Sequence, residues 1–249
     1  MAMSCRQKLT LILLLFYWPA IFVLSHLPRV PDWVIGVPVS DKTLHYLAYL
    51  VLVFLLWFSI NPDRKVNWRG TNVWWVLLVV VWYGALDEWL QRYVGRNPDL
   101  VDFLADLAGM VTTLVVLWIF SFWPASVAVT GVVIFVLTNF TRANPVDLLP
   151  RASTVFYLLA YAFFSLLWIR CIYHQFLLKA PQPKWLAAAL VLPVAFLAGV
   201  ELFSEVAGNG FKLWRVVIST AGIAGAVFTI FLIALLRWCR KQSLSHGDH

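Results

Sequence analysis

Long apolar runs, separated by short polar segments, follow one another along almost the whole chain. Each run is long enough for a membrane-spanning helix, which needs about 20 predominantly apolar residues. No long polar stretch remains between them for a soluble domain. The pattern therefore predicts eight transmembrane helices, at about residues 9–26, 43–60, 73–93, 100–122, 125–140, 154–177, 185–205 and 215–237.

Composition supports this class of protein. The chain is 62% hydrophobic and only 12% charged, whereas soluble domains carry about 25% charged residues. The N-terminus resembles a signal peptide, because Arg6 and Lys8 precede the first apolar run. The run is long for the core of a signal peptide, however, and no small-residue cleavage site follows it. We therefore expect it to remain as the first helix. The shortest span, at 125–140, follows Trp123-Pro124 and is the weakest of the eight.

Basic residues in the loops predict the orientation. With eight spans both termini lie on one side, and that side holds eleven of the 19 Lys and Arg residues but two of the 12 acids. Cytoplasmic loops carry the excess of Lys and Arg, so we expect both termini to be cytoplasmic. Cys5, Cys171 and Cys239 fall near the same side, where thiols stay reduced. The net charge of +7 thus reflects topology, and no nucleic-acid partner is expected.

Ordered similarities between the two halves indicate an internal duplication. The segment 21–25 recurs at 134–138, and Asp87 and Gln91 align with Glu201 and Glu205. Four helices per copy is an even number, so the copies would insert with the same polarity. We therefore predict an all-α membrane protein with two parallel four-helix repeats, at 1–122 and 123–249, the second ending in a short cytoplasmic tail. The alternative is chance similarity between apolar segments.

The second copy lacks most of the polar residues of the first. Asp102, Asp106 and Gly109 align with Arg215, Ser219 and Gly222, while Glu88 becomes Leu202; Asp41, Lys42 and His45 become Ala152, Ser153 and Phe156. We expect any active site to lie in the first repeat, with Glu201, Glu205 and Arg215 as a residual polar cluster in the second.

Polar residues of the first repeat gather at the ends of three spans. A charge at the bilayer centre costs roughly 2.5–3.5 kcal/mol on insertion scales, so charges at the edge of a span indicate a functional site. On helices, residues four apart share a face, which aligns Asp41 with His45, Asp87 with Gln91, and Glu88 with Arg92. Because the loop at 95–99 is short, the third and fourth helices must be neighbours. The residues concerned are Asp41, Lys42 and His45; Asp87, Glu88, Gln91 and Arg92; and Arg96, Asp99, Asp102 and Asp106.

Structural roles are the alternative for several of these residues. Ser40 with Asp41, and Asp99 or Asp102, are suitable helix N-caps. His45 alone would be an ordinary interhelical hydrogen-bonding residue, and Asp87 could belong to a solvated face.

These segments resemble the two signatures of VanZ-like membrane proteins. Asp41-Lys42-x-x-His45 is similar to the first, and Asp87-Glu88-x-x-Gln91, followed by a Gly-Arg loop and an Asp-rich helix start, is similar to the second. Asp106 departs from the family, which often has Asn there, and adds a negative charge or a protonated carboxyl to the site. The resemblance implies a bacterial plasma-membrane protein; the family is associated with teicoplanin resistance and envelope polysaccharide genes, without a settled biochemical activity.

The leading hypothesis is an outward-facing site that binds or modifies an anionic envelope component, such as a lipid-linked glycan or a phospholipid head group. Lys42, Arg92 and Arg96 would contact phosphate or carboxylate. Membrane lipids are the expected partners, and a proton-coupled small-molecule transporter is the alternative. The sequence does not identify a substrate, cofactor, metal or oligomeric state, nor whether the protein is an enzyme. Candidate catalytic residues are Asp87, Glu88, His45 and Asp106, which would orient the ligand, hold a divalent cation or transfer protons; Asp41, Gln91 and Asp102 complete the candidate ligand-binding set.

Overall fold

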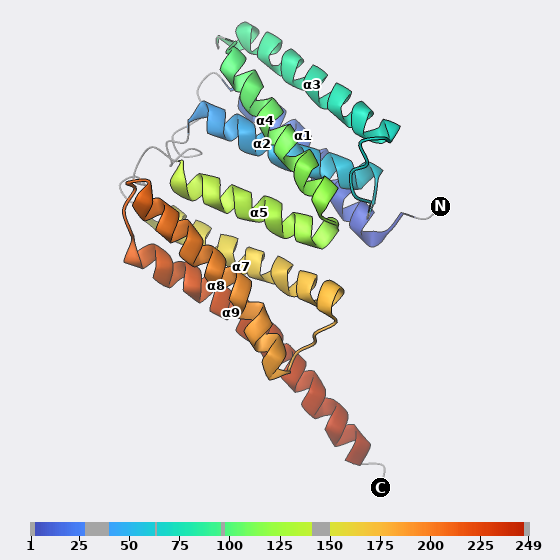
Figure 1. Cartoon of the computed structure of the whole chain (residues 1–249), viewed down its shortest axis with the longest axis vertical. Coiled ribbons are helices and arrows are strands. Elements are labelled where there is room, and N and C mark those ends of the chain that lie inside the picture. Colours follow the sequence, from blue (N-terminus) through green and yellow to red (C-terminus); the bar gives the residue numbers. More distant parts are fainter. Residues whose placement is uncertain (1–2, 28–39, 63, 96–97, 141–149, 247–249) are drawn as a thin grey trace. The chain divides into compact units, whose positions relative to one another are not determined.

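The computed structural model describes residues 3–27, 40–62, 64–95, 98–140 and 150–246, and within these ranges the protein is helical without strands (Figure 1). One short 3-10 helix, η1, directly follows α3. The helices are α1 (Cys5–Ser25), α2 (Asp41–Ile60), α3 (Thr71–Gln91), η1 (Arg92–Val94), α4 (Leu100–Ile119), α5 (Phe122–Asn139), α7 (Pro150–Phe176), α8 (Pro183–Val206) and α9 (Leu213–His246).

Eight of the described helices are long and apolar enough to cross a membrane. The predicted number and order of spans are therefore confirmed, and the chain is a multi-pass membrane protein. Most bounds differ by a few residues, as where α1 begins at Cys5 and α4 ends at Ile119, whereas α9 continues to His246, nine residues beyond the predicted end at 237. The fifth span forms an 18-residue helix in which Pro124 occupies the first turn, where a missing N–H breaks no helical hydrogen bond.

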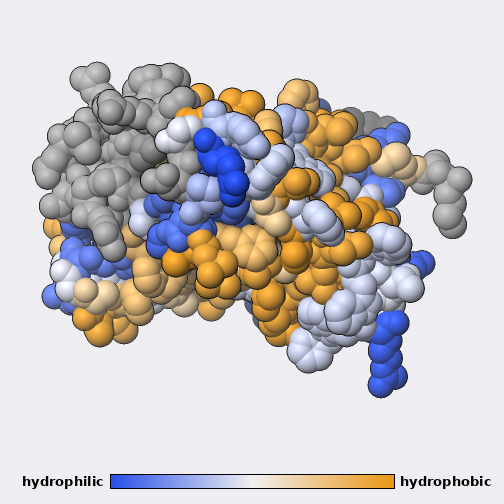
Figure 2. Space-filling view, turned by 90° about the horizontal axis from the view of Figure 1, so that it is seen from above, coloured by the Kyte–Doolittle hydropathy of each residue, from blue (hydrophilic) through white to orange (hydrophobic). Residues whose placement is uncertain are grey.

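Large apolar side chains cover much of the described surface. On the face drawn in Figure 2, hydrophobic residues alternate with smaller hydrophilic patches. In a soluble protein such exposure would be a liability, but on a membrane-spanning helix these side chains contact lipid. On α3 the exposed residues include Trp74, Trp75, Trp82 and Trp89.

The chain divides into two compact units, Met1–Asn144 and Pro145–His249. The first contains α5, which packs against α2 and α4. The boundary between the compact units, at Asn144 and Pro145, therefore differs from the boundary between the predicted repeats at 1–122 and 123–249. The repeats were inferred from sequence similarity and remain a prediction.

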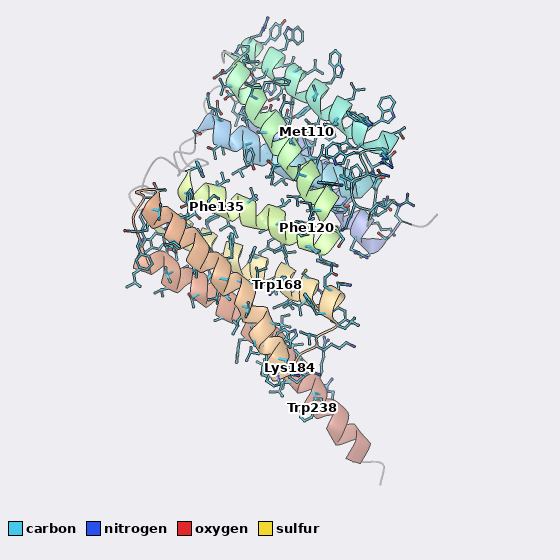
Figure 3. The ribbon with its side chains drawn as sticks, in the orientation of Figure 1. Met110, Phe120, Phe135, Trp168, Lys184 and Trp238 are labelled. Atoms are coloured by element: carbon cyan, nitrogen blue, oxygen red, sulfur yellow. The ribbon has the colours of Figure 1, made fainter. Side chains whose placement is uncertain are left out.

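In the first unit, α4 crosses α2 at close range (Figure 1). A Cβ added to Gly109 of α4 would collide with the carbonyl oxygen of Tyr46 on α2 and approach the amide nitrogen of Leu50 to 3.0 Å. One turn further along, the Thr113 hydroxyl donates a hydrogen bond to the Leu50 carbonyl at 2.7 Å. Figure 3 shows the side chains between the helices, with the buried Met110 of α4 labelled. The absent side chain of Gly109 therefore sets the separation of the two helices.

The second unit is built from α7, α8 and α9. Gly222 of α9 lies against the backbone of α7, where an added Cβ would collide with the Leu158 carbonyl oxygen. The Trp168 indole, labelled in Figure 3, donates to the Ala188 carbonyl of α8 at 2.8 Å. Within this unit α8 and α9 are also joined by the buried side chains of Glu201 and Arg215.

Candidate functional site

The start of α2 places two predicted site residues. Ser40 is the N-cap, and its hydroxyl accepts from the backbone N–H of Thr43 at 3.3 Å. Asp41 then lies in the first turn, where a negative charge is favoured by the helix dipole. The cap is therefore Ser40 rather than Asp41, and the helix it begins carries His45 one turn inward, where the imidazole is buried.

The connection from α3 to α4 brings two more carboxylates to the same end of the unit. Gly95 ends η1 with φ of 77°, a left-handed conformation that glycine adopts without strain. Asp99 is the N-cap of α4, and its side chain accepts from the Val101 N–H at 2.8 Å. The capping interpretation of Asp99 is thus confirmed. Asp102 follows in the first turn and is buried.

Lys42 joins the ends of α2 and α4 at the exposed edge of the site. Its ammonium donates to Asp99 at 2.9 Å and lies 3.4 Å from Asp102, and its side chain is 48% exposed. The hydrogen bond from Lys42 lowers the pKa of the Asp99 carboxyl below its ordinary value. A lowered pKa in the folded state contributes stability at neutral pH, which is lost as the pH falls through that value. Both groups are exposed, so the contribution is small.

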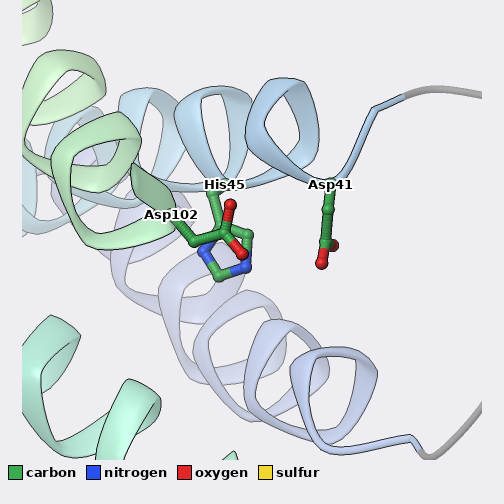
Figure 4. A group of neighbouring side chains, drawn as sticks. All are labelled: Asp41, His45 and Asp102. Atoms are coloured by element: carbon green, nitrogen blue, oxygen red, sulfur yellow. The ribbon is translucent and has the colours of Figure 1, made fainter. Parts of the chain in front are cut away.

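A buried imidazole–carboxylate pair lies beneath this edge. Nδ1 of His45 is 2.9 Å from Oδ1 of Asp106, and the two side chains are 7% and 1% exposed. Figure 4 shows Asp102 of α4 beside the His45 ring, with the carboxylate of Asp41 directed into the same space. Residues 61 positions apart in the sequence thus meet because α2 and α4 pack closely.

Asp87 of α3 is held by residues from the end of α1. The Ser25 hydroxyl donates to its Oδ1 at 2.8 Å, and Nδ1 of His26 lies 3.6 Å from the same oxygen. Gln91 donates to Oδ2 at 3.3 Å from one turn along α3. Asp87 is buried, so it does not belong to a solvated face. The sequence prediction missed Ser25 and His26, although they are the polar residues that end the first apolar run.

Three buried oxygen atoms at this end have no hydrogen-bond partner among the described residues. One is Oε1 of Glu88, whose other oxygen accepts from the Asp99 N–H at 3.0 Å. The others are Oδ2 of Asp106 and the hydroxyl of Tyr49. A Cβ added to Gly84 would lie 3.4 Å from that Asp106 oxygen and 3.3 Å from the Tyr49 oxygen. Buried polar groups normally have partners, so these atoms mark the part of the site that the protein does not satisfy itself.

Eight residues form what we call the polar cluster. Most of the predicted site residues come together in it, whereas Arg92 lies exposed on η1 and Arg96 falls outside the described residues. Two groups within the cluster have potential ligand atoms within 4.8 Å of one another: Asp41, His45 and Asp102, and His45, Glu88 and Asp106. The cluster consists of Asp41, Lys42, His45, Asp87, Glu88, Asp99, Asp102 and Asp106.

The arrangement suits two kinds of chemistry. An imidazole oriented by a buried carboxylate is a proton donor or acceptor of fixed direction. An exposed ammonium beside it is a contact for an anionic ligand.

Comparison with family models, with curated proteins and with solved structures found no match to this chain. The resemblance to VanZ-like proteins therefore rests on the two sequence signatures and stays a prediction.

Proposed function

We propose that this chain is a VanZ-like protein of the bacterial plasma membrane that binds or modifies an anionic component of the cell envelope. A lipid-linked glycan or a phospholipid head group is the class of ligand. Such an activity would suit a role in glycopeptide resistance or envelope polysaccharide biogenesis. The polar cluster would face the outside of the cell, where these head groups are exposed.

The observation that carries this proposal is the position of Lys42 above the buried part of the cluster. An ammonium has three donors, and Asp99 and Asp102 account for two of them among the described residues. The third is left for a phosphate or carboxylate oxygen. Arg92 is exposed on η1 and offers a second cationic contact. Charge-assisted hydrogen bonds are stronger than neutral ones, and a guanidinium binds phosphate in two-pronged geometry.

Modification of the bound component would use the pair formed by His45 and Asp106. The carboxylate fixes the ring and stabilises its protonated form, so the imidazole can exchange a proton with a ligand held at Lys42. Binding alone needs only the cationic contacts. If the protein modifies the ligand, His45→Gln should abolish turnover while the ligand still occupies the site. If the protein only binds the ligand, the wild type shows no turnover and His45→Gln leaves the occupancy unchanged.

Removing the exposed ammonium should weaken head-group binding. Loss of one hydrogen bond to a charged group costs about 1.5–3 kcal/mol, so Lys42→Gln should reduce retention of anionic lipid by about tenfold or more. Native mass spectrometry of the full chain, purified from bacterial membranes in mild detergent, measures the retained lipid and its mass. A phospholipid and a lipid-linked glycan are distinguished by that mass.

Lys65→Gln is the matched control for Lys42→Gln. Lys65 is also exposed, but its ammonium donates to the Ile119 carbonyl at 2.7 Å, beyond the opposite end of α2. Retention should be unchanged in this variant. Equal retention by wild type and both variants would contradict the proposal.

The proposed orientation has its own test. An impermeant thiol reagent added to intact cells should label a Pro98→Cys variant, because residue 98 is exposed beside the cluster. It should leave Arg69→Cys unlabelled. The natural Cys5 and Cys239 are exposed and should react only after the membrane is permeabilised, which provides an internal control. Labelling of Arg69→Cys but not Pro98→Cys in intact cells would reverse the orientation.

Proton-coupled transport is the second candidate, favoured by the buried pair of His45 and Asp106. Against it, the charged and histidine residues of α2, α3 and α4 all lie at one end of these helices. A relay across the membrane needs further titratable groups along the path. Binding or chemistry at one side of the membrane therefore accounts better for the distribution of these residues.

We also propose that the two predicted repeats, 1–122 and 123–249, derive from one four-helix ancestor and insert into the membrane with the same polarity. The close approaches at Gly109 and Gly222 support this relationship. In each, the glycine meets the carbonyl oxygen of one residue and the backbone nitrogen of the residue four positions on: Tyr46 and Leu50, or Leu158 and Ala162.

A further inference from the structure

In the part of the first unit that the structure describes, buried carboxylates outnumber the cations that contact them. Four carboxylates of the polar cluster are buried: Asp87, Glu88, Asp102 and Asp106, at 2%, 7%, 5% and 1% exposure. Among the described residues, their cationic partners are the partly exposed Lys42 and the imidazoles of His26 and His45. Buried charges are normally paired or coordinate a metal ion, since an isolated one is strongly unfavourable.

In the second unit, a buried carboxylate is paired with a cationic side chain of the protein itself. There the Glu201 carboxylate accepts two hydrogen bonds from the Arg215 guanidinium, at 2.5 and 2.7 Å. In the sequence alignment of the two halves, Arg215 corresponds to Asp102. By this alignment the first unit has a carboxylate where the second has its guanidinium, and a bound metal ion would supply a positive charge there.

We propose that His45, Glu88 and Asp106 form a binding site for a divalent transition-metal ion. Each of the three offers one ligand atom, and these atoms lie within 4.8 Å of one another. Two ligands of one zinc ion, at bond lengths of 2.0–2.2 Å, are separated by roughly 3–4.4 Å. A small contraction of side chains therefore closes the site around an ion, without movement of the helices.

The unsatisfied oxygens are a second and independent observation for this site. Oε1 of Glu88 and Oδ2 of Asp106 are both buried without a hydrogen-bond partner among the described residues. An ion at this position gives such oxygens the positive partner that they lack. The other group of potential ligands, formed by Asp41, His45 and Asp102, includes an exposed residue and has no such oxygens, so the buried group is the site.

The ligand set selects the class of ion. One imidazole nitrogen with two carboxylate oxygens suits Zn²⁺ or Mn²⁺, whereas Ca²⁺ and Mg²⁺ prefer oxygen ligands alone. Three protein ligands leave at least one coordination position for water or an anion. The inference does not rest on the proposed function, because the ion binds the chain's own side chains whether or not a head group is present.

The test is direct titration of the full chain, purified without a histidine tag, stripped with chelator and placed in lipid nanodiscs. Calorimetry with Zn²⁺ or Mn²⁺ should give one tight site per chain. Glu88→Gln and Asp106→Asn should each weaken it by about 10–100-fold, by analogy with the losses seen for changes around metal sites. Glu205→Gln changes an exposed carboxylate of α8 and should bind as the wild type does.

A second measurement does not depend on the variants folding. Pulsed electron paramagnetic resonance of the Mn²⁺-loaded wild type should show coupling to an imidazole nitrogen. The proposal is overturned if that coupling is absent, if the wild type shows no saturable tight site, or if folded Glu88→Gln and Asp106→Asn bind as tightly as the Glu205→Gln control.

Discussion

An Arg215→Met variant should lose about 3–5 kcal/mol of unfolding free energy, because it leaves the buried Glu201 carboxylate without its cation. The pair is 5% and 3% exposed, and the guanidinium also donates to the Ser204 hydroxyl at 3.0 Å. Removal of Arg215 leaves an uncompensated charge in a low-dielectric interior, while the Ser204 hydroxyl keeps only its hydrogen bond to the Gly210 carbonyl at 3.3 Å. Reversible unfolding in mixed micelles, followed by tryptophan fluorescence, measures the change.

Two variants separate this effect from general disturbance of the helices. Arg170→Met removes an exposed arginine of α7 and should change stability by less than about 0.5 kcal/mol. Glu201→Gln combined with Arg215→Met removes both charges and should recover most of the loss, since neutral replacements of a buried ion pair are often well tolerated. A loss in Arg215→Met no larger than in Arg170→Met would show that the pair does not stabilise the second unit.

The buried pair also changes how the functional roles of the two units should be compared. We expect envelope phenotypes to depend on Glu88 and Asp106 rather than on the second unit. Glu201→Ala would nevertheless reduce the amount of folded protein, because it leaves the buried Arg215 charge without its partner. The comparison therefore needs equal quantities of folded protein, which the double neutral variant provides.

The helices were predictable because their signal is local. A run of about 20 apolar residues determines a span wherever it packs, and Ser40, Asp99 and Gly95 carry the capping and turn signals in their own side chains or backbone. The exact ends were less predictable. Thus α1 begins four residues before the predicted span at residue 9, because polar residues extend a helix without adding to its apolar run.

The site was only partly predictable, because helical spacing defines faces but not the partner of each face. The pairs Asp41 with His45 and Asp87 with Gln91 follow from a four-residue spacing. The contact between Ser25 and Asp87 depends on how α1 packs beside α3. The spacing of residues along one helix does not predict that packing. Alternatives that looked exclusive were also compatible: Asp99 caps α4 and accepts a hydrogen bond from Lys42 as well.

A Gly109→Ala variant should both destabilise the first unit and weaken binding at the polar cluster. Its added methyl group would collide with the Tyr46 carbonyl oxygen, so α2 and α4 must separate. Overpacking of this kind costs about 1–3 kcal/mol. Tyr46 directly follows His45, and Gly109 lies one turn from Asp106, so the same separation lengthens the 2.9 Å contact between the imidazole and the carboxylate. Unfolding in mixed micelles and titration with Mn²⁺ in nanodiscs measure the two effects.

Gly222→Ala is the matched control, because its methyl group would collide with the Leu158 carbonyl oxygen in the second unit. It should cost a similar amount of stability but leave Mn²⁺ binding unchanged under conditions where the chain is folded. Gly199→Ala adds a Cβ with no neighbouring atom within 4 Å and should be neutral or stabilising by up to about 1 kcal/mol, since alanine favours helix more than glycine does. Equal losses of Mn²⁺ binding in Gly109→Ala and Gly222→Ala would show that the close approach of α2 and α4 does not hold the cluster together.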